Sequence, residues 1–140
     1  MIIKGQNGQI VFVSRLYEGH EFDYSILKIE FPPTEDWFMD KTLNVDLGFQ
    51  GIATDYKAEK IIIPHKKKRV TKGQSNELSE EQKAYNKQAS ALRIDIEHSI
   101  GQIKLCRNIH QVVRIKNDLL LDNIVLVAAG LANFRNTITI

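Results

Sequence analysis

The alternation of hydrophobic and polar positions predicts a chain in which short strands and helices follow one another. The run Ile10–Tyr17 is rich in β-branched and aromatic residues, which is typical of a strand, and residues 1–4 resemble part of another. Asn7 and Gly8 lie between these runs and favour the tight turn of a β-hairpin. Two further strands are expected, at Thr42–Val45 and at Lys60–Ile63.

Short helices are expected between the strands. Asp23 is a candidate N-cap for a helix that continues to about Ile29. Pro32 and Pro33 stop this helix, because proline cannot donate a backbone hydrogen bond and clashes with the preceding turn. A second short helix is expected near Thr54–Ala58.

Two longer helices occupy the second half of the chain. Ser79 and Gln82 have the spacing of a capping box, which predicts a helix that continues to about Leu105. The last helix is expected at about Asn117–Phe134. It is apolar nearly all round, so we expect it to be buried.

This order of strands and helices predicts a mixed α/β fold, and residues 1–140 are expected to form a single domain. The hydrophobic share of 43% and the charged share of 26% are those of a globular protein and argue against disorder. The longest apolar run, Ile124–Ala132, is too short to span a bilayer. A single cysteine, Cys106, cannot form an internal disulfide and fits a reducing compartment, so a cytoplasmic location is expected.

The charge is distributed unevenly. The net charge is +2, yet residues 57–72 contain seven Lys or Arg and one Glu, which gives this stretch +6. A basic patch on a slightly acidic body indicates a contact with a polyanion at one place. A solvated loop would show the same charge, so both interpretations remain open.

Two acids carry the candidate chemistry. Asp46 ends an apolar run and is followed by a glycine turn, and Glu97 lies 51 residues later inside a helical pattern. Metal-dependent nuclease sites are commonly assembled from one carboxylate at the end of a strand and another on a helix, because the metal ions need carboxylate ligands.

The helix that carries Glu97 has two adjacent faces. At about 100° per residue, an apolar stripe faces one way and is expected to pack on a sheet. This stripe consists of Leu92, Ile96, Ile100 and Ile103. Arg93, Glu97 and Lys104 lie directly beside it. An ordinary ion pair between Arg93 and Glu97, four residues apart, is the alternative to a catalytic role.

Two segments together resemble the C-terminal half of DDE transposases from bacterial insertion sequences, in the group related to Harbinger-type elements. Arg93, Glu97 and Lys104 keep the spacing of the family's Tyr-Arg-Glu-Lys helix, although Ser90 stands at the tyrosine position. The family's Asp-x-Gly-Phe-x-Gly segment is matched by Asp46, Gly48, Phe49 and Gly51. Shorter matches are Pro64-x-Lys66-Lys67, Asn86 and Leu131-x-Asn133-Phe134-Arg135. Gly19 and Asp23 match a Gly-x-x-His-Asp segment in which Phe22 replaces His.

The resemblance implies a ribonuclease H-like mixed sheet flanked by helices, and cleavage and transfer of DNA strands with two Mg²⁺ or Mn²⁺ ions. It implies that Asp46 and Glu97 bind metal, that Lys104 lies near a DNA phosphate, and that Arg93 orients or neutralises nearby charge. Contacts to DNA phosphates are expected from Lys66, Lys67, Lys68 and Arg69. The expected DNA partner is the transposon end.

The family's first Asp lies on a strand before the hairpin, and no Asp precedes Asp23 here. We therefore expect the fold to be N-terminally truncated, with the first strand missing, and the chain alone to be inactive. An unpaired strand edge favours self-association or marginal stability. The upstream transposase segment or a second copy of the chain is a candidate partner. The alternatives are a non-catalytic nucleic-acid-binding fragment and a decayed transposase remnant.

Overall fold

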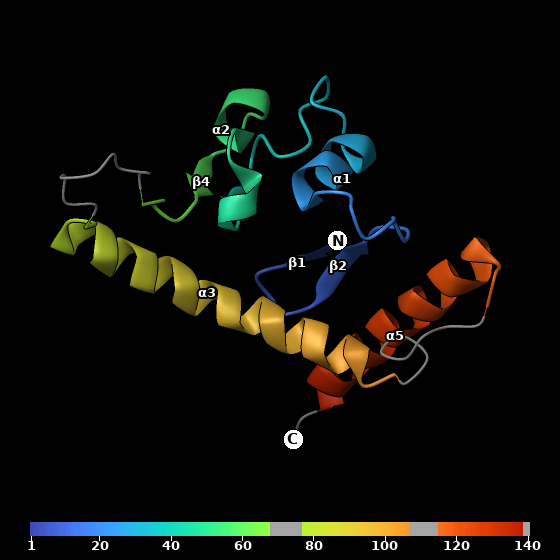
Figure 1. Ribbon diagram of the computed structural model, residues 1–140. Helices are drawn as coiled ribbons and strands as arrows, with labels where there is room; N and C mark the ends of the chain where they lie inside the picture. Colours follow the sequence, from blue (N-terminus) through green and yellow to red (C-terminus); the bar gives the residue numbers. More distant parts are fainter. Residues whose placement is uncertain (68–76, 107–114, 139–140) are drawn as a thin grey trace. The chain divides into compact units, whose positions relative to one another are not determined.

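A computed structural model of the chain describes residues 1–67, 77–106 and 115–138. The chain divides into two compact units, Met1–Glu21 with Ile94–Ile140 and Phe22–Arg93, which are described separately. One long helix, α3 (Glu80–Lys104), contributes residues to both units (Figure 1). The order of elements is that of a mixed α/β protein, as the sequence predicts.

The first unit begins with the expected hairpin. Strands β1 (Ile2–Lys4) and β2 (Ile10–Val13) pair antiparallel, with an irregular register between Ile3 and Lys4. Gly8 takes a left-handed conformation at φ 78°, which glycine adopts without strain. The strand is shorter than the predicted Ile10–Tyr17: it ends at Val13, and a bond from Ser14 N to Met1 O follows.

The core of this unit lies where helix α5 (Asp118–Ile138) meets β2 and the end of α3. Its buried members are Ile10, Ile103, Ala128, Ala129 and Ala132. Alanines have short side chains, so they allow the backbone of α5 to come close to its neighbours. The buried contact of α5 is therefore made by its small residues, whereas the sequence pattern predicted burial of the whole helix.

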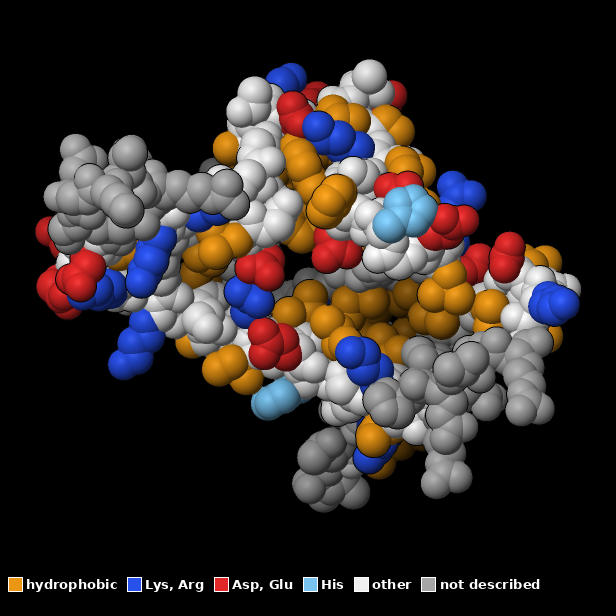
Figure 2. All heavy atoms as spheres, viewed as in Figure 1, with side chains coloured by type: hydrophobic (Ala, Val, Ile, Leu, Met, Phe, Trp, Pro, Cys, Tyr) orange, Lys and Arg blue, Asp and Glu red, His pale blue; other side chains and the backbone are white. Residues whose placement is uncertain are grey.

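The expectation that the last helix is buried is wrong for much of its surface. Leu119, Val127 and Phe134 are 63–70% exposed, and Leu126 and Leu131 are also exposed. Periodicity cannot show this, because a helix that is apolar all round does not reveal which side has a partner. Exposed hydrophobic side chains can be followed in orange among the charged ones in Figure 2.

Two polar side chains of α5 bind the backbone of the β2 segment. Asn133 accepts a hydrogen bond from Ile10 N at 2.7 Å and donates one to Ile10 O at 2.9 Å. Asp122 accepts a hydrogen bond from Leu16 N at 2.7 Å, beyond the end of the strand. Side chains of a helix thus satisfy strand groups that would otherwise need another strand.

The second unit contains a parallel pair of strands. β3 (Thr42–Asn44) and β4 (Lys60–Ile62) are aligned from Thr42 beside Lys60 to Asn44 beside Ile62. A 3-10 turn, η1 (Leu47–Phe49), and helix α2 (Ile52–Asp55) connect them. Helix α1 (Asp23–Glu30) precedes β3.

The ends of the short helices differ from the prediction. Asp23 is the first residue of α1 and not its N-cap; Phe22 holds that position without a side-chain hydrogen bond. A carboxylate within the first turn still interacts favourably with the helix dipole. α2 begins at Ile52, two residues before the expected Thr54, because Gly51 at φ 95° turns the chain and Ile52 is almost fully buried.

The core of this unit contains aromatic rings as well as the buried Ile26, Leu27 and Ile52. Phe31 contacts Trp37 and Phe38 with ring centres 5.4 and 5.5 Å apart, and Phe38 contacts Tyr56 at 5.5 Å. The polar atoms of the cluster also have partners: Tyr56 donates its hydroxyl hydrogen to Phe31 O, and Trp37 Nε1 donates to Pro32 O. Trp37 is therefore a loop anchor at the edge of the core.

Helix α3 confirms the predicted capping box. Ser79 N donates to Gln82 Oε1 at 3.1 Å, and Gln82 N donates to Ser79 Oγ at 3.2 Å. The expected apolar stripe is only partly correct, since Ile103 is buried but Leu92 is 57% exposed. No helix in the described part of the chain is long and apolar enough to cross a membrane.

Candidate functional site

Asp46 lies directly after β3 and forms the N-cap of η1. Its Oδ1 accepts a hydrogen bond from Leu47 N at 2.6 Å. The same oxygen forms an ion pair with Arg93 Nη1 at 2.9 Å. The side chains of Asp46 and Arg93 are 50% and 29% exposed, so a ligand in solution can reach the carboxylate. The pairing joins Asp46 of the first predicted motif to Arg93 of the second.

The loop that follows Asp46 is held from α1. The Phe49 ring meets the edge of the Tyr24 ring, with centres 6.0 Å apart. Gly51 needs its positive φ, and a side chain there would also approach Tyr24. Nothing lies within 4 Å of a Cβ added at Gly48. The structure therefore explains Phe49 and Gly51 of the motif, but offers no account of Gly48.

A polar cluster that the sequence did not reveal joins α1 to α2. Asp55 Oδ2 accepts the Tyr24 hydroxyl hydrogen at 2.6 Å and forms an ion pair with Lys28. The Lys28 Nζ also lies 4.5 Å from the centre of the Tyr24 ring. Tyr24 and Lys28 are four residues apart and share one face of α1, which is the only signal in the sequence. Asp55 comes from a distant position that no spacing identifies.

The protonation of this cluster follows from its contacts. Hydrogen bonds from Lys28 and from Tyr24 hold the pKa of Asp55 below its usual range. Burial and the hydrogen bond to Asp55 raise the pKa of Tyr24. Asp55 is therefore charged and Tyr24 neutral at neutral pH, which keeps the contact between α1 and α2 intact.

Glu97 and Lys104 belong to the part of α3 that lies in the first unit. Both are exposed, and they follow Arg93 in an unbroken helix by four and eleven residues. Nearby, the buried Lys4 ammonium binds Asp95 Oδ1 at 2.7 Å and Asp95 O at 3.1 Å. This contact fixes the hairpin to α3 at Asp95, two residues before Glu97.

The basic segment, residues 65–69, begins at the surface. Pro64 is buried at the end of β4, and His65, Lys66 and Lys67 are exposed after it. Lys68 and Arg69, the other two predicted phosphate contacts, lie outside the described residues. Lys66 and Lys67, the first two of the four predicted phosphate contacts, are thus accessible to a large anion.

The residues present have the chemistry that a divalent metal requires. Mg²⁺ prefers oxygen ligands and commonly uses one or two protein carboxylates, and the half-exposed Asp46 carboxylate is such a ligand. Within residues 1–67, 77–106 and 115–138, no three His, Cys, Asp or Glu side chains lie close enough together to hold a metal ion. Asp46 therefore fits a metal ligand that acts together with other groups.

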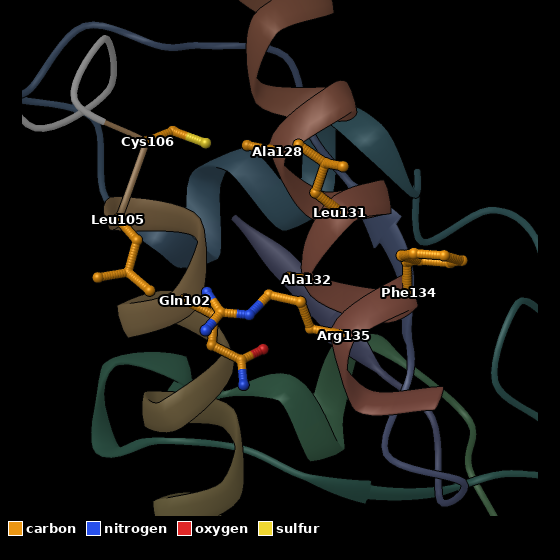
Figure 3. Close-up of a pocket in the computed structure, with 8 residues that line it drawn as sticks. All are labelled: Gln102, Leu105, Cys106, Ala128, Leu131, Ala132, Phe134 and Arg135. Carbon is orange, nitrogen blue, oxygen red and sulfur yellow. The ribbon is translucent and has the colours of Figure 1, made fainter. Parts of the chain in front are cut away.

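A pocket of about 300 Å³ lies elsewhere, inside the first unit. Its lining combines the end of α3 with the second half of α5 (Figure 3). The Arg135 side chain extends from α5 toward Gln102, whose Oε1 is buried with no hydrogen-bond partner among the described residues. Neither Asp46 nor Glu97 lines this pocket.

Comparison with known proteins bears on the two motifs. The family model for the DDE superfamily endonuclease matches residues 1–133, which include Asp46 and all of α3. No curated protein and no solved structure matches the chain. Because the match covers nearly the whole sequence, the chain belongs to the DDE superfamily endonucleases.

Proposed function

We propose that this chain acts in the divalent-metal-dependent cleavage and transfer of DNA strands, as the C-terminal part of a DDE transposase catalytic domain. The family match supports the nuclease class. The two motif segments support the transposase assignment, to the Harbinger-related group of bacterial insertion sequences. A ribonuclease H-like arrangement of the strands, in one domain over residues 1–140, belongs to the same proposal.

The observation that carries the proposal is the ion pair between Asp46 and Arg93. Asp46 belongs to the first motif and Arg93 to the second, so the pair links segments that are far apart in the sequence. A structural ion pair alone would not require that both partners come from the motifs of one nuclease family. The pair therefore supports the assignment of Asp46 and Arg93 to one site.

Each residue has a distinct proposed role. Asp46 and Glu97 bind Mg²⁺ or Mn²⁺ through carboxylate oxygens. The metal ions would activate the attacking oxygen and stabilise the leaving oxygen of the phosphodiester. Arg93 orients Asp46 and balances its charge before the metal is bound. Lys104 and the basic residues Lys66, Lys67, Lys68 and Arg69 contact DNA phosphates at transposon ends.

A further carboxylate completes the proposed two-metal site. The two motifs supply Asp46 and Glu97, so we propose that another polypeptide segment supplies this group and that the chain alone does not cleave DNA. An upstream transposase segment is the proposed source. A second copy of the chain is the other proposed partner.

Metal-dependent nicking of a plasmid that carries transposon ends tests the proposal, with the upstream segment supplied. We expect Asp46→Ala and Glu97→Ala to lower the nicking rate by at least about 100-fold, because each removes a metal ligand. Asp40→Ala is the matched control, since Asp40 is an exposed acid outside both motifs. Wild-type rates in both motif variants would show that these acids are not the site.

A non-catalytic nucleic-acid-binding role is the second candidate, favoured by the exposed Lys66 and Lys67. In that case DNA binding would depend on salt and on these lysines, while Asp46→Ala and Glu97→Ala would bind normally and no nicking would occur under any condition. A decayed remnant would show neither activity.

A further inference from the structure

The start of the basic segment is tied to α3 by one amide side chain. Asn86 Oδ1 accepts a hydrogen bond from His65 N at 2.7 Å, and Asn86 Nδ2 donates one to His65 O at 3.0 Å. Both bonds go to the backbone of a single residue, so the amide occupies the place that a neighbouring strand would take. All of these atoms belong to the unit Phe22–Arg93.

Two other contacts fix the same point. Pro64, directly before His65, is buried, and proline restricts its own backbone rotation. The His65 ring lies 5.0 Å from the ring of Tyr85, the residue before Asn86 on α3. The backbone at His65 is thus held on both sides, and the exposed Lys66 and Lys67 follow immediately.

We propose that Asn86 is a positioning residue for DNA binding: it fixes the backbone at His65 and so presents Lys66 and Lys67 together to DNA phosphates. This inference rests on the proposed contact between the basic segment and DNA. Without the two hydrogen bonds, the backbone at His65 would become ordered only when DNA binds. The conformational entropy lost in that ordering would weaken the affinity. Asn86 itself does not touch the DNA.

The salt dependence of binding separates positioning from contact. Each phosphate contact releases counterions and adds about 0.9 to the slope of log affinity against log salt. A residue that only positions the lysines leaves the number of contacts unchanged, so its loss lowers affinity at an unchanged slope. Replacement of Lys66 and Lys67 removes phosphate contacts, so it must reduce the slope.

The test measures binding of a short duplex DNA to the full chain at several salt concentrations. We expect Asn86→Ala to bind about fivefold more weakly at an unchanged slope, as for about one residue that must be ordered on binding. The double variant Lys66→Ala, Lys67→Ala should lower the slope by about 2. His65→Ala should bind within about twofold of wild type, because the clamp uses the backbone and not the imidazole.

Asn133→Ala is the matched control. Asn133 binds Ile10 N and Ile10 O in the same manner, but in the other unit. We expect both Asn133→Ala and Asn86→Ala to lower the thermal stability of the protein. Asn133→Ala should nevertheless keep the wild-type DNA affinity. Equal affinity losses in the two variants would overturn the inference, because they would indicate a general effect of stability.

Other outcomes distinguish the clamp from the function on which it rests. If the lysine variant weakens binding and Asn86→Ala does not, the positioning role is wrong and the DNA contact remains. If the lysine variant binds like wild type, the DNA contact itself is wrong. Hydrogen exchange of the His65 amide in the unmodified chain provides a second measurement, and exchange at the rate of an open peptide would also overturn the inference.

Discussion

The two units are stabilised by different kinds of side chain. In Phe22–Arg93, aromatic rings pack in tilted contacts around Phe38. In the unit of Met1–Glu21 and Ile94–Ile140, three alanines of α5 pack against Ile10 and Ile103. Both units also use an asparagine amide to bind backbone groups of a distant segment.

The difference shows what each kind of packing can support. Large rings reach across gaps, so they can fix irregular loops such as the one between Asp46 and Gly51. Alanine packing needs two regular surfaces at close distance, and it buries only one side of α5. The unit with rings accordingly carries Asp46 and the described start of the basic segment, which follow strands β3 and β4.

The largest expected effect on stability comes from the aromatic core. Phe38→Ala removes a ring that is 8% exposed and contacts two other rings, so we expect the free energy of unfolding to fall by about 3–5 kcal/mol. Trp37, the single tryptophan, lies in this unit and reports its unfolding by fluorescence in urea. Met39→Ala, at a residue 55% exposed, should change stability by less than about 0.5 kcal/mol. A loss below about 1 kcal/mol in Phe38→Ala would contradict a core built on rings.

A smaller effect is expected in the alanine core. Ala132→Leu adds a bulky side chain at a position that is 2% exposed, and overpacking should cost about 1–3 kcal/mol of unfolding free energy. Circular dichroism of the helices during urea unfolding measures the loss. The control Val127→Ala lies on the exposed side of the same helix and should stay within about 0.5 kcal/mol of wild type. Unchanged stability in Ala132→Leu would mean that α5 does not pack closely.

The smallest effect concerns pH and the Tyr24–Asp55–Lys28 cluster. Folding lowers the pKa of Asp55. Its stabilising effect is therefore present above its unfolded pKa of about 4, and it is lost as pH falls through the folded value. The pKa of Tyr24 is raised, so its effect is present below about pH 10 and is lost as pH rises through the folded value. Stability measured through Trp37 should therefore decline on both sides of neutrality.

The variant Asp55→Asn tests the assignment of that pH dependence. Without the charge, stability at neutral pH should be lower, and the decline below about pH 4 should be shallower than in wild type. Asp40→Asn, at an exposed acid, should leave the pH profile as it is. An identical acid profile in Asp55→Asn and wild type would show that the cluster does not couple to folding.

Local signals explain what could be predicted from the sequence. The hairpin at Asn7-Gly8, the capping box at Ser79 and the order of the strands depend on neighbouring residues, and the structure confirms them. The membership in a DDE endonuclease family followed from two spaced motifs and is confirmed over residues 1–133. The roles of Asp46 and Glu97 remain predictions that the nicking experiment tests.

Other features depend on contacts between distant residues. Arg93 binds Asp46 across 47 positions of sequence, and no local pattern reveals this pair. Asp55 completes a cluster with Tyr24 and Lys28 that no spacing reveals. The exposed side of α5 was misjudged for the same reason, since its residues are apolar on every side.

The sequence by itself determined the order of elements, the family and the candidate acids, because hydrophobic period, turn residues and motif spacing are properties of the local chain. Only the tertiary structure decided that Arg93 binds Asp46, that Asn86 holds His65, and that alanines form the buried side of α5. Hydrogen bonds, ion pairs and burial depend on which groups meet in space. That meeting is fixed by the packing of the whole unit and not by the spacing of residues along the chain.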